Sequence, residues 1–240
     1  MAATIASIPQ EDRNVVRFYV WELPVRLAHW GIVSMLVVLS VTGYYIQNPY
    51  LVAYGRHAYV MGTMRSIHLS AGFLFMAALL IRLYWFFAGN QFARWRAFLP
   101  LTKKQRENLV GTIRFYGFRR YSPPPTIGHN QLATAAYSVI YLLAAVECVT
   151  GLTMYNAQVK MHFLNVFIGW IPRLVDIQIL RSIHYCIMFA FWAFLVHHLY
   201  SAILTALQER NGLIDSIFTG NKSVSLELVE EETREDDSHR

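Results

Sequence analysis

The most constraining feature of the sequence is an apolar stretch, residues 181–200, that carries histidines near both ends. A helix needs about 20 mainly apolar residues to cross a bilayer, and this stretch has that length. His184 and His198 are fourteen residues apart, so in a helix they lie ~21 Å apart along the axis and within ~40° of each other around it. One face of this helix therefore presents two imidazoles at two depths.

The neighbouring His197 lies roughly 140° from that face, so the geometry favours His198, although whether His197 can substitute stays open. Two interpretations of the His184 and His198 pair are possible. The histidines are either satisfied polar residues in a helix interface or axial ligands of iron. A membrane bundle can hold a flat cofactor near each surface with one histidine from each of two facing helices. The second interpretation requires partner histidines at matching depths.

The composition is that of a membrane protein, because 55% of the residues are hydrophobic, above the usual share in soluble domains. Four apolar segments predict spans at about 29–46, 66–88, 130–154 and 182–207. The sequence thus predicts an all-α integral membrane protein, a four-transmembrane-helix bundle over residues 18–212. Residues 1–17 are predicted to be a flexible N-terminus without a signal cleavage pattern, and residues 213–240 a polar tail.

The segment between the second and third spans fixes the predicted orientation. Residues 89–128 carry eight lysines and arginines against the single acid Glu107. By the positive-inside rule this segment and both termini are cytoplasmic, in a multi-pass protein of the cell inner membrane. A nucleic-acid partner is the rival explanation of the basic charge, but membrane lipid explains it without one.

This topology sorts four histidines into two pairs. His29 begins the first span and His198 ends the fourth, so both lie near the cytoplasmic face. His68 and His184 begin the second and fourth spans at the outer face. Two levels with two imidazoles each favour two bound haems over the alternative that the histidines are merely polar residues of the helix interfaces. The haems would be non-covalent, because the two cysteines lack the C-x-x-C-H spacing of attached haem.

Short motifs around these histidines recur. The Arg-Ser-Ile-His segment at 65–68 recurs at 181–184, and the Val-Thr-Gly segment at 41–43 recurs at 149–151, which suggests a duplicated helical hairpin. Arg65 and Arg181 could pair with haem propionates or simply reach the interface. Gly43 and Gly72 lie on the histidine faces, where a missing side chain admits either a flat cofactor or a neighbouring helix.

A polar cluster, His129 and Asn130, opens the third span at the cytoplasmic side. Asn130 could cap the helix. The two side chains could equally hydrogen-bond a carbonyl ligand at the membrane surface.

Several motifs together resemble the b-type cytochrome subunit of membrane-bound nickel-iron uptake hydrogenases. They are VWELPVRLAHW at 20–30, RSIHLSAG at 65–72, IGHN at 127–130 and the spacing of the two histidines in the fourth span. The resemblance covers about Tyr19 to Asn221. The histidine pattern alone is shared with other dihaem membrane cytochromes, including those of formate dehydrogenases.

The resemblance implies a function and a ligand set. Matched residue by residue, the iron ligands of the family fall on His29, His68, His184 and His198. Such a subunit anchors the large and small hydrogenase subunits at the outer, periplasmic face. It passes electrons from the iron-sulfur small subunit through two haems b to quinone, with no catalytic residue of its own. The resemblance therefore makes His129 and Asn130 the predicted quinone site. The alternatives are the cytochrome of another quinone-linked dehydrogenase, or a non-haem membrane carrier or anchor.

Overall fold

The computed structural model describes residues 15–50, 59–99, 102–119, 121, 131–209 and 212–225. These residues form two compact units. The helical unit comprises residues 27–88 and 135–199. The terminal unit comprises the described residues before 27, from 89 to 134 and after 199.

Four long helices supply the helical unit. They are α1 (Leu23–Gln47), α2 (Val60–Ala88), α4 (Gln131–Val159) and α7 (Ile177–Glu209). All four are long and apolar enough to cross a membrane, α7 as far as Leu207, which agrees with the four predicted spans. The helix α1 begins before the predicted residue 29 because Pro24 occupies its first turn, where a missing N–H costs nothing.

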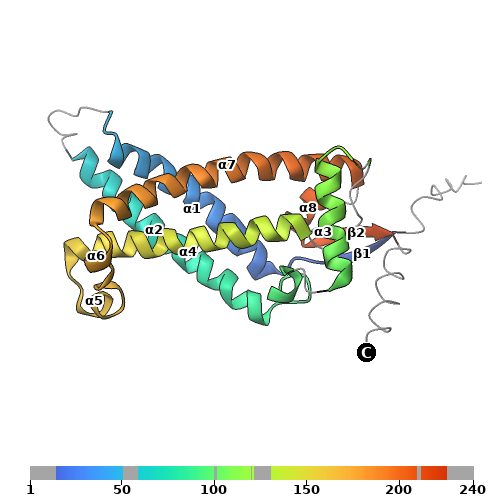
Figure 1. Cartoon of the computed structure of the whole chain (residues 1–240), viewed down its shortest axis with the longest axis horizontal. Helices are drawn as coiled ribbons and strands as arrows, with labels where there is room; N and C mark the ends of the chain where they lie inside the picture. Colours follow the sequence, from blue (N-terminus) through green and yellow to red (C-terminus); the bar gives the residue numbers. More distant parts are fainter. Residues whose placement is uncertain are drawn as a thin grey trace, which may run out of the picture. The chain divides into compact units, whose positions relative to one another are not determined.

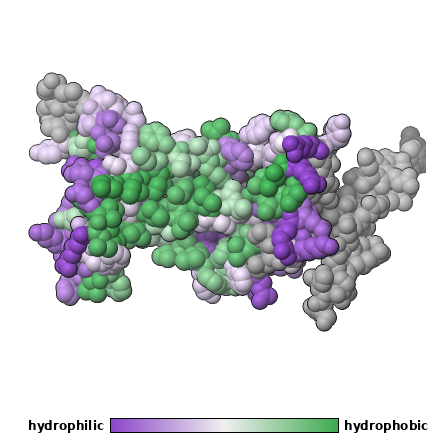
Figure 2. Space-filling model, viewed as in Figure 1, coloured by the Kyte–Doolittle hydropathy of each residue, from purple (hydrophilic) through white to green (hydrophobic). Residues whose placement is uncertain are grey.

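The interior of the helical unit is small and its outer surface is apolar. Phe75 from α2, Ala144 from α4 and Phe191 from α7 form the buried cluster, and side chains of α1 pack against it. Large side chains such as Leu142 and Val196 remain 65% and 68% exposed, and hydrophobic residues cover much of the helix surface in Figure 2. Such a surface suits a lipid environment, where all helical backbone groups are already paired.

Two short helices connect α4 to α7. These are α5 (His162–Ile168) and α6 (Ile171–Leu174), and Figure 1 shows them at the end where α4 passes to α7. Phe163 and Phe167 pack against each other with ring centres 5.0 Å apart, yet both remain exposed.

The terminal unit corrects the predicted boundaries. The strand β1 (Val15–Tyr19) pairs antiparallel with β2 (Asn221–Ser225), and α8 (Leu213–Thr219) precedes β2. The protein is therefore mostly helical rather than all-α. Residues 15–17 belong to a strand instead of a flexible N-terminus, and residues 213–225 are folded rather than a simple polar tail.

Side-chain contacts hold the segments next to β1 and β2 together. The Trp21 indole Nε1 donates to Ser216 Oγ at 3.1 Å, and Val20 is fully buried.

Residues 89–128 also contain regular structure, η3 (Trp95–Ala97) and α3 (Lys103–Tyr116). A capping box between Thr102 and Gln105 starts α3 by satisfying backbone N–H groups that a helix start leaves open.

Candidate cofactor site

The structure brings the four histidines together as two pairs. The ring centres of His68 (α2) and His184 (α7) are 6.3 Å apart, and those of His29 (α1) and His198 (α7) are 6.4 Å apart. Metal–imidazole bonds are about 2 Å long, so two imidazoles on one ion place their ring centres about 6 Å apart. Both spacings fit a shared metal ion.

His198, and not His197, faces His29. The side chain of His197 is exposed on the same helix, whereas His198 is half-buried. The helical rotation that separates neighbouring residues accounts for this difference.

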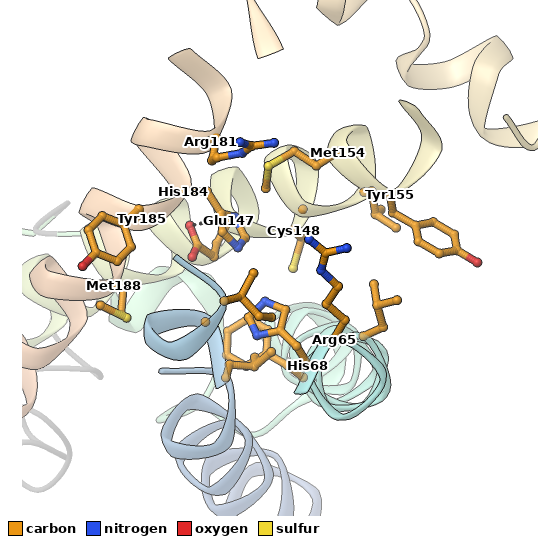
Figure 3. Close-up of a pocket in the computed structure, with 18 of the residues that line it drawn as sticks. Arg65, His68, Glu147, Cys148, Met154, Tyr155, Arg181, His184, Tyr185 and Met188 are labelled. Atoms are coloured by element: carbon orange, nitrogen blue, oxygen red, sulfur yellow. Dashed lines mark ion pairs between the residues drawn. The ribbon is translucent and has the colours of Figure 1, made fainter. Parts of the chain in front are cut away.

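A cavity of about 430 Å³ contains the His68/His184 pair and is lined by α1, α2, α4 and α7. This volume lies in the usual range of cofactor pockets. Arg65 and Arg181 also line it, and Figure 3 shows all four side chains around the same space. The cavity therefore offers two imidazoles for a metal and two guanidinium groups for acidic substituents of its carrier.

Each histidine of this pair is held by a threonine from another helix. Thr42 Oγ1 lies 2.9 Å from His68 Nδ1, and Thr150 Oγ1 lies 2.9 Å from His184 Nδ1. Both threonines are buried. Because Nδ1 is engaged in each ring, the other nitrogen, Nε2, is the one left for a metal.

The glycine after each threonine makes room for the imidazole. A Cβ atom at Gly43 would lie 3.1 Å from His68 Cε1, and one at Gly151 would lie 3.2 Å from His184 Cε1. A Cβ atom at Gly72 would meet only Leu39, at an ordinary 3.9 Å. The sequence-based interpretation of Gly43 is thus refined, because the group that approaches its backbone is a histidine ring.

Glu147 on α4 is a site residue that the sequence interpretation overlooked. Its Oε2 atom lies 3.4 Å from His184 Nδ1, a contact drawn as a dashed line in Figure 3. This oxygen is buried and has no hydrogen-bond partner among the described residues. Glu147 is the only acidic residue in the sequence of α4. An acid inside a span is costly and usually functional, which is the signal that could have found it.

The His29/His198 pair has different neighbours. Tyr137 Oη lies 3.4 Å from His198 Nδ1, and the Phe194 ring stacks on His198 at 5.5 Å with an interplanar angle of 13°. None of these neighbours was predicted from the sequence.

The pairs have the composition expected for a metal held in a macrocycle. Among the residues that the structure describes, no three His, Cys, Asp or Glu side chains converge as they would around a bare ion. A haem supplies its iron with four nitrogens, so one pair of imidazoles would complete the ligand set. The residues present fit that group.

His129 and Asn130 lie outside the described residues, so the quinone site stays a prediction.

Comparisons with known proteins agree with this chemistry. Residues 20–220 match the family model described as prokaryotic cytochrome b561. A "Probable Ni/Fe-hydrogenase 1 B-type cytochrome subunit" of Escherichia coli is 33% identical, over 89% of this chain and 94% of the relative. "Probable Ni/Fe-hydrogenase B-type cytochrome subunit" proteins are 32% identical in Bradyrhizobium diazoefficiens, over 92% of both chains, and 31% identical in Cupriavidus necator, over 88% of this chain and 89% of the relative.

The glycine contacts predict a selective packing defect. Gly43→Ala and Gly151→Ala should each displace one imidazole, because overpacking of this kind costs about 1–3 kcal/mol. We expect haem content, measured by the pyridine haemochrome spectrum of the purified protein, to fall in both variants. Gly62→Ala on α2, where a Cβ atom would meet nothing within 4 Å, is the control and should keep the wild-type content. Equal haem content in all three variants would contradict the role assigned to Gly43 and Gly151.

Proposed function

Because this chain belongs to the prokaryotic cytochrome b561 family, we propose that it is a membrane dihaem cytochrome b that anchors a nickel-iron hydrogenase and delivers electrons to quinone. Family membership itself implies haem b, electron transfer and a multi-pass membrane protein. The observation that carries the finer proposal is the presence of two imidazole pairs with nearly equal ring separations, 6.3 and 6.4 Å.

His68 and His184 would hold one haem, and His29 and His198 the other. A bound haem supplies reversible one-electron chemistry at its iron. Arg65 and Arg181 would neutralise the propionates of the first haem, since both line its cavity. The two histidine levels of α7 are ~21 Å apart along the helix, so electrons would cross much of the bilayer between them.

The orientation follows from the charge of residues 89–128, which would face the cytoplasm of a cell inner membrane together with both termini. The His68/His184 pair would then be the outer level, and the His29/His198 pair the inner level. α5 and α6 would face the periplasm, where electrons would enter from an external donor.

The relatives named above suggest which donor this is. Their printed names contain Ni/Fe-hydrogenase, which favours an iron-sulfur small subunit and its large subunit over a formate dehydrogenase. The exposed phenylalanines of α5 would belong to the docking surface for that partner. At the other face, His129 and Asn130 would bind quinone. The alternative of a non-haem carrier or anchor does not account for the two imidazole pairs.

The haem assignment is tested by neighbouring histidines. Wild-type protein should contain two low-spin haems b, each with two histidine ligands. His198→Ala should remove one haem because it takes a ligand from the inner pair, whereas the exposed neighbour variant His197→Ala should keep both. Haem quantification and electron paramagnetic resonance spectra provide the measurement. One haem in the wild type, or the opposite behaviour of the two variants, would refute the ligand set.

The donor surface is tested on α5. The double variant Phe163→Ser/Phe167→Ser should retain both haems but lose hydrogen-dependent haem reduction in membranes, because an apolar docking patch has become polar. Phe118→Ser, which changes a still more exposed aromatic on the predicted cytoplasmic side, is the control. Wild-type haem reduction by hydrogen in the double variant would place the donor elsewhere.

The quinone site is tested separately from both. His129→Ala and Asn130→Ala should slow quinone reduction, since each removes a group predicted to hydrogen-bond a quinone carbonyl. Haem content and hydrogen-dependent haem reduction should stay at wild-type values. His162→Ala, on the predicted outer side, serves as the control. If both variants reduce quinone at the normal rate, the quinone binds at another place.

A further inference from the structure

The two buried threonines beside the His68/His184 pair form a repeated hydrogen-bond pattern. The Thr42 hydroxyl donates to the carbonyl oxygen of Val38 at 2.7 Å, one turn back in its own helix. The Thr150 hydroxyl donates in the same way to Val146 at 2.9 Å. Each hydroxyl also lies 2.9 Å from a histidine Nδ1 atom. The same three-way contact thus occurs twice, once in each half of the chain.

This pattern assigns the protons. A hydroxyl has one hydrogen and two lone pairs. When that hydrogen points to the helix carbonyl, the oxygen can only accept from the imidazole, so Nδ1 carries the ring proton. In neutral imidazole the other nitrogen, Nε2, then has a free lone pair.

We propose that Thr42 and Thr150 are the positioning residues of this pair, holding each ring in the Nδ1-protonated form with Nε2 available to iron. The proposal rests on the proposed function, because it presumes a haem between His68 and His184. In a water-free site an unpaired N–H would cost about 1–3 kcal/mol, so the threonine acceptors also stabilise the liganded arrangement. The following glycine admits the ring and the threonine fixes its rotation.

The hydrogen bond also has an electronic effect. An acceptor on Nδ1–H makes Nε2 a stronger base, which favours the oxidised iron over the reduced iron. Removing the acceptor should therefore raise the reduction potential of the outer haem. The inner haem should not respond, because His198 has Tyr137 and not a threonine near its Nδ1 atom.

Thr42 provides the cleaner test of the two. His68 has one further acceptor, the Leu39 backbone carbonyl. His184 has two, the Glu147 backbone carbonyl and the Glu147 carboxylate, whose Oε2 atom lies 3.4 Å from Nδ1. A matched control exists on α4, where Thr153 is buried and donates to Val149 at 2.7 Å, within its own helix. Among the residues that the structure describes, the Thr153 hydroxyl forms no hydrogen bond with a histidine. Thr153→Val therefore removes the same intrahelical bond without touching the pair.

The experiment is a redox titration of the full chain in detergent, followed through its haem absorption, together with electron paramagnetic resonance of the oxidised protein. Thr42→Val should raise the potential of one haem and change one low-spin signal while the other haem keeps its wild-type values. Thr42→Ser should restore both properties because it retains the hydroxyl. Thr153→Val should leave both haems unchanged.

Each outcome decides the proposal. Loss of one haem in Thr42→Val, with two haems in Thr42→Ser and Thr153→Val, also supports it, since the acceptor is then needed for binding itself. Unchanged potentials and signals in Thr42→Val, or an equal shift in Thr153→Val, would overturn it. The proposed function fails separately, through a wild-type protein that lacks two haems with paired histidine ligands.

Discussion

A membrane interior offers no water to an imidazole, and this constraint explains how the helical unit is built. Both ring nitrogens of a buried histidine need partners from the protein or from a cofactor. A threonine contacts the Nδ1 atom of His68, and another contacts the Nδ1 atom of His184. The ring centres of the two histidines are 6.3 Å apart, which leaves room for one metal ion between them. The packing of α1 against α2, and of α4 against α7, therefore supplies each of these histidines with a hydrogen-bond partner at this level.

Features with a helical period were predictable from the sequence alone. The four spans follow from apolar length, and the pairing of His29 with His198 follows from topology and from fourteen-residue spacing on one helix face. The choice of His198 over His197 depends only on rotation around a helix. These inferences succeed because helix geometry is local, so sequence separation converts directly to distance and angle.

Features that depend on contacts between distant residues were not predictable in the same way. The strands β1 and β2 have five residues each and pair residues 15–19 with residues 221–225, so neither has a strong local signal. Thr42 lies within a motif that was noticed, but its contact with His68 depends on how two helices pack. Glu147 was visible as an isolated acid, although only the structure places it beside His184.

The motifs that recur in the two halves of the chain explain why the two histidine pairs differ. Thr42 and Thr150 are equivalent, and the residues thirteen positions before them are His29 and Tyr137. His68 and His184 are also equivalent, and fourteen positions after them lie Arg82 and His198. The His68/His184 pair therefore uses the same position of both halves and has the threonine–glycine arrangement twice. The His29/His198 pair takes one histidine from each half at different positions, and Tyr137, the counterpart of His29, lies instead beside His198 Nδ1. The recurring motifs thus give one nearly symmetric histidine pair and one asymmetric pair, so two cofactors bound at these pairs would have different surroundings.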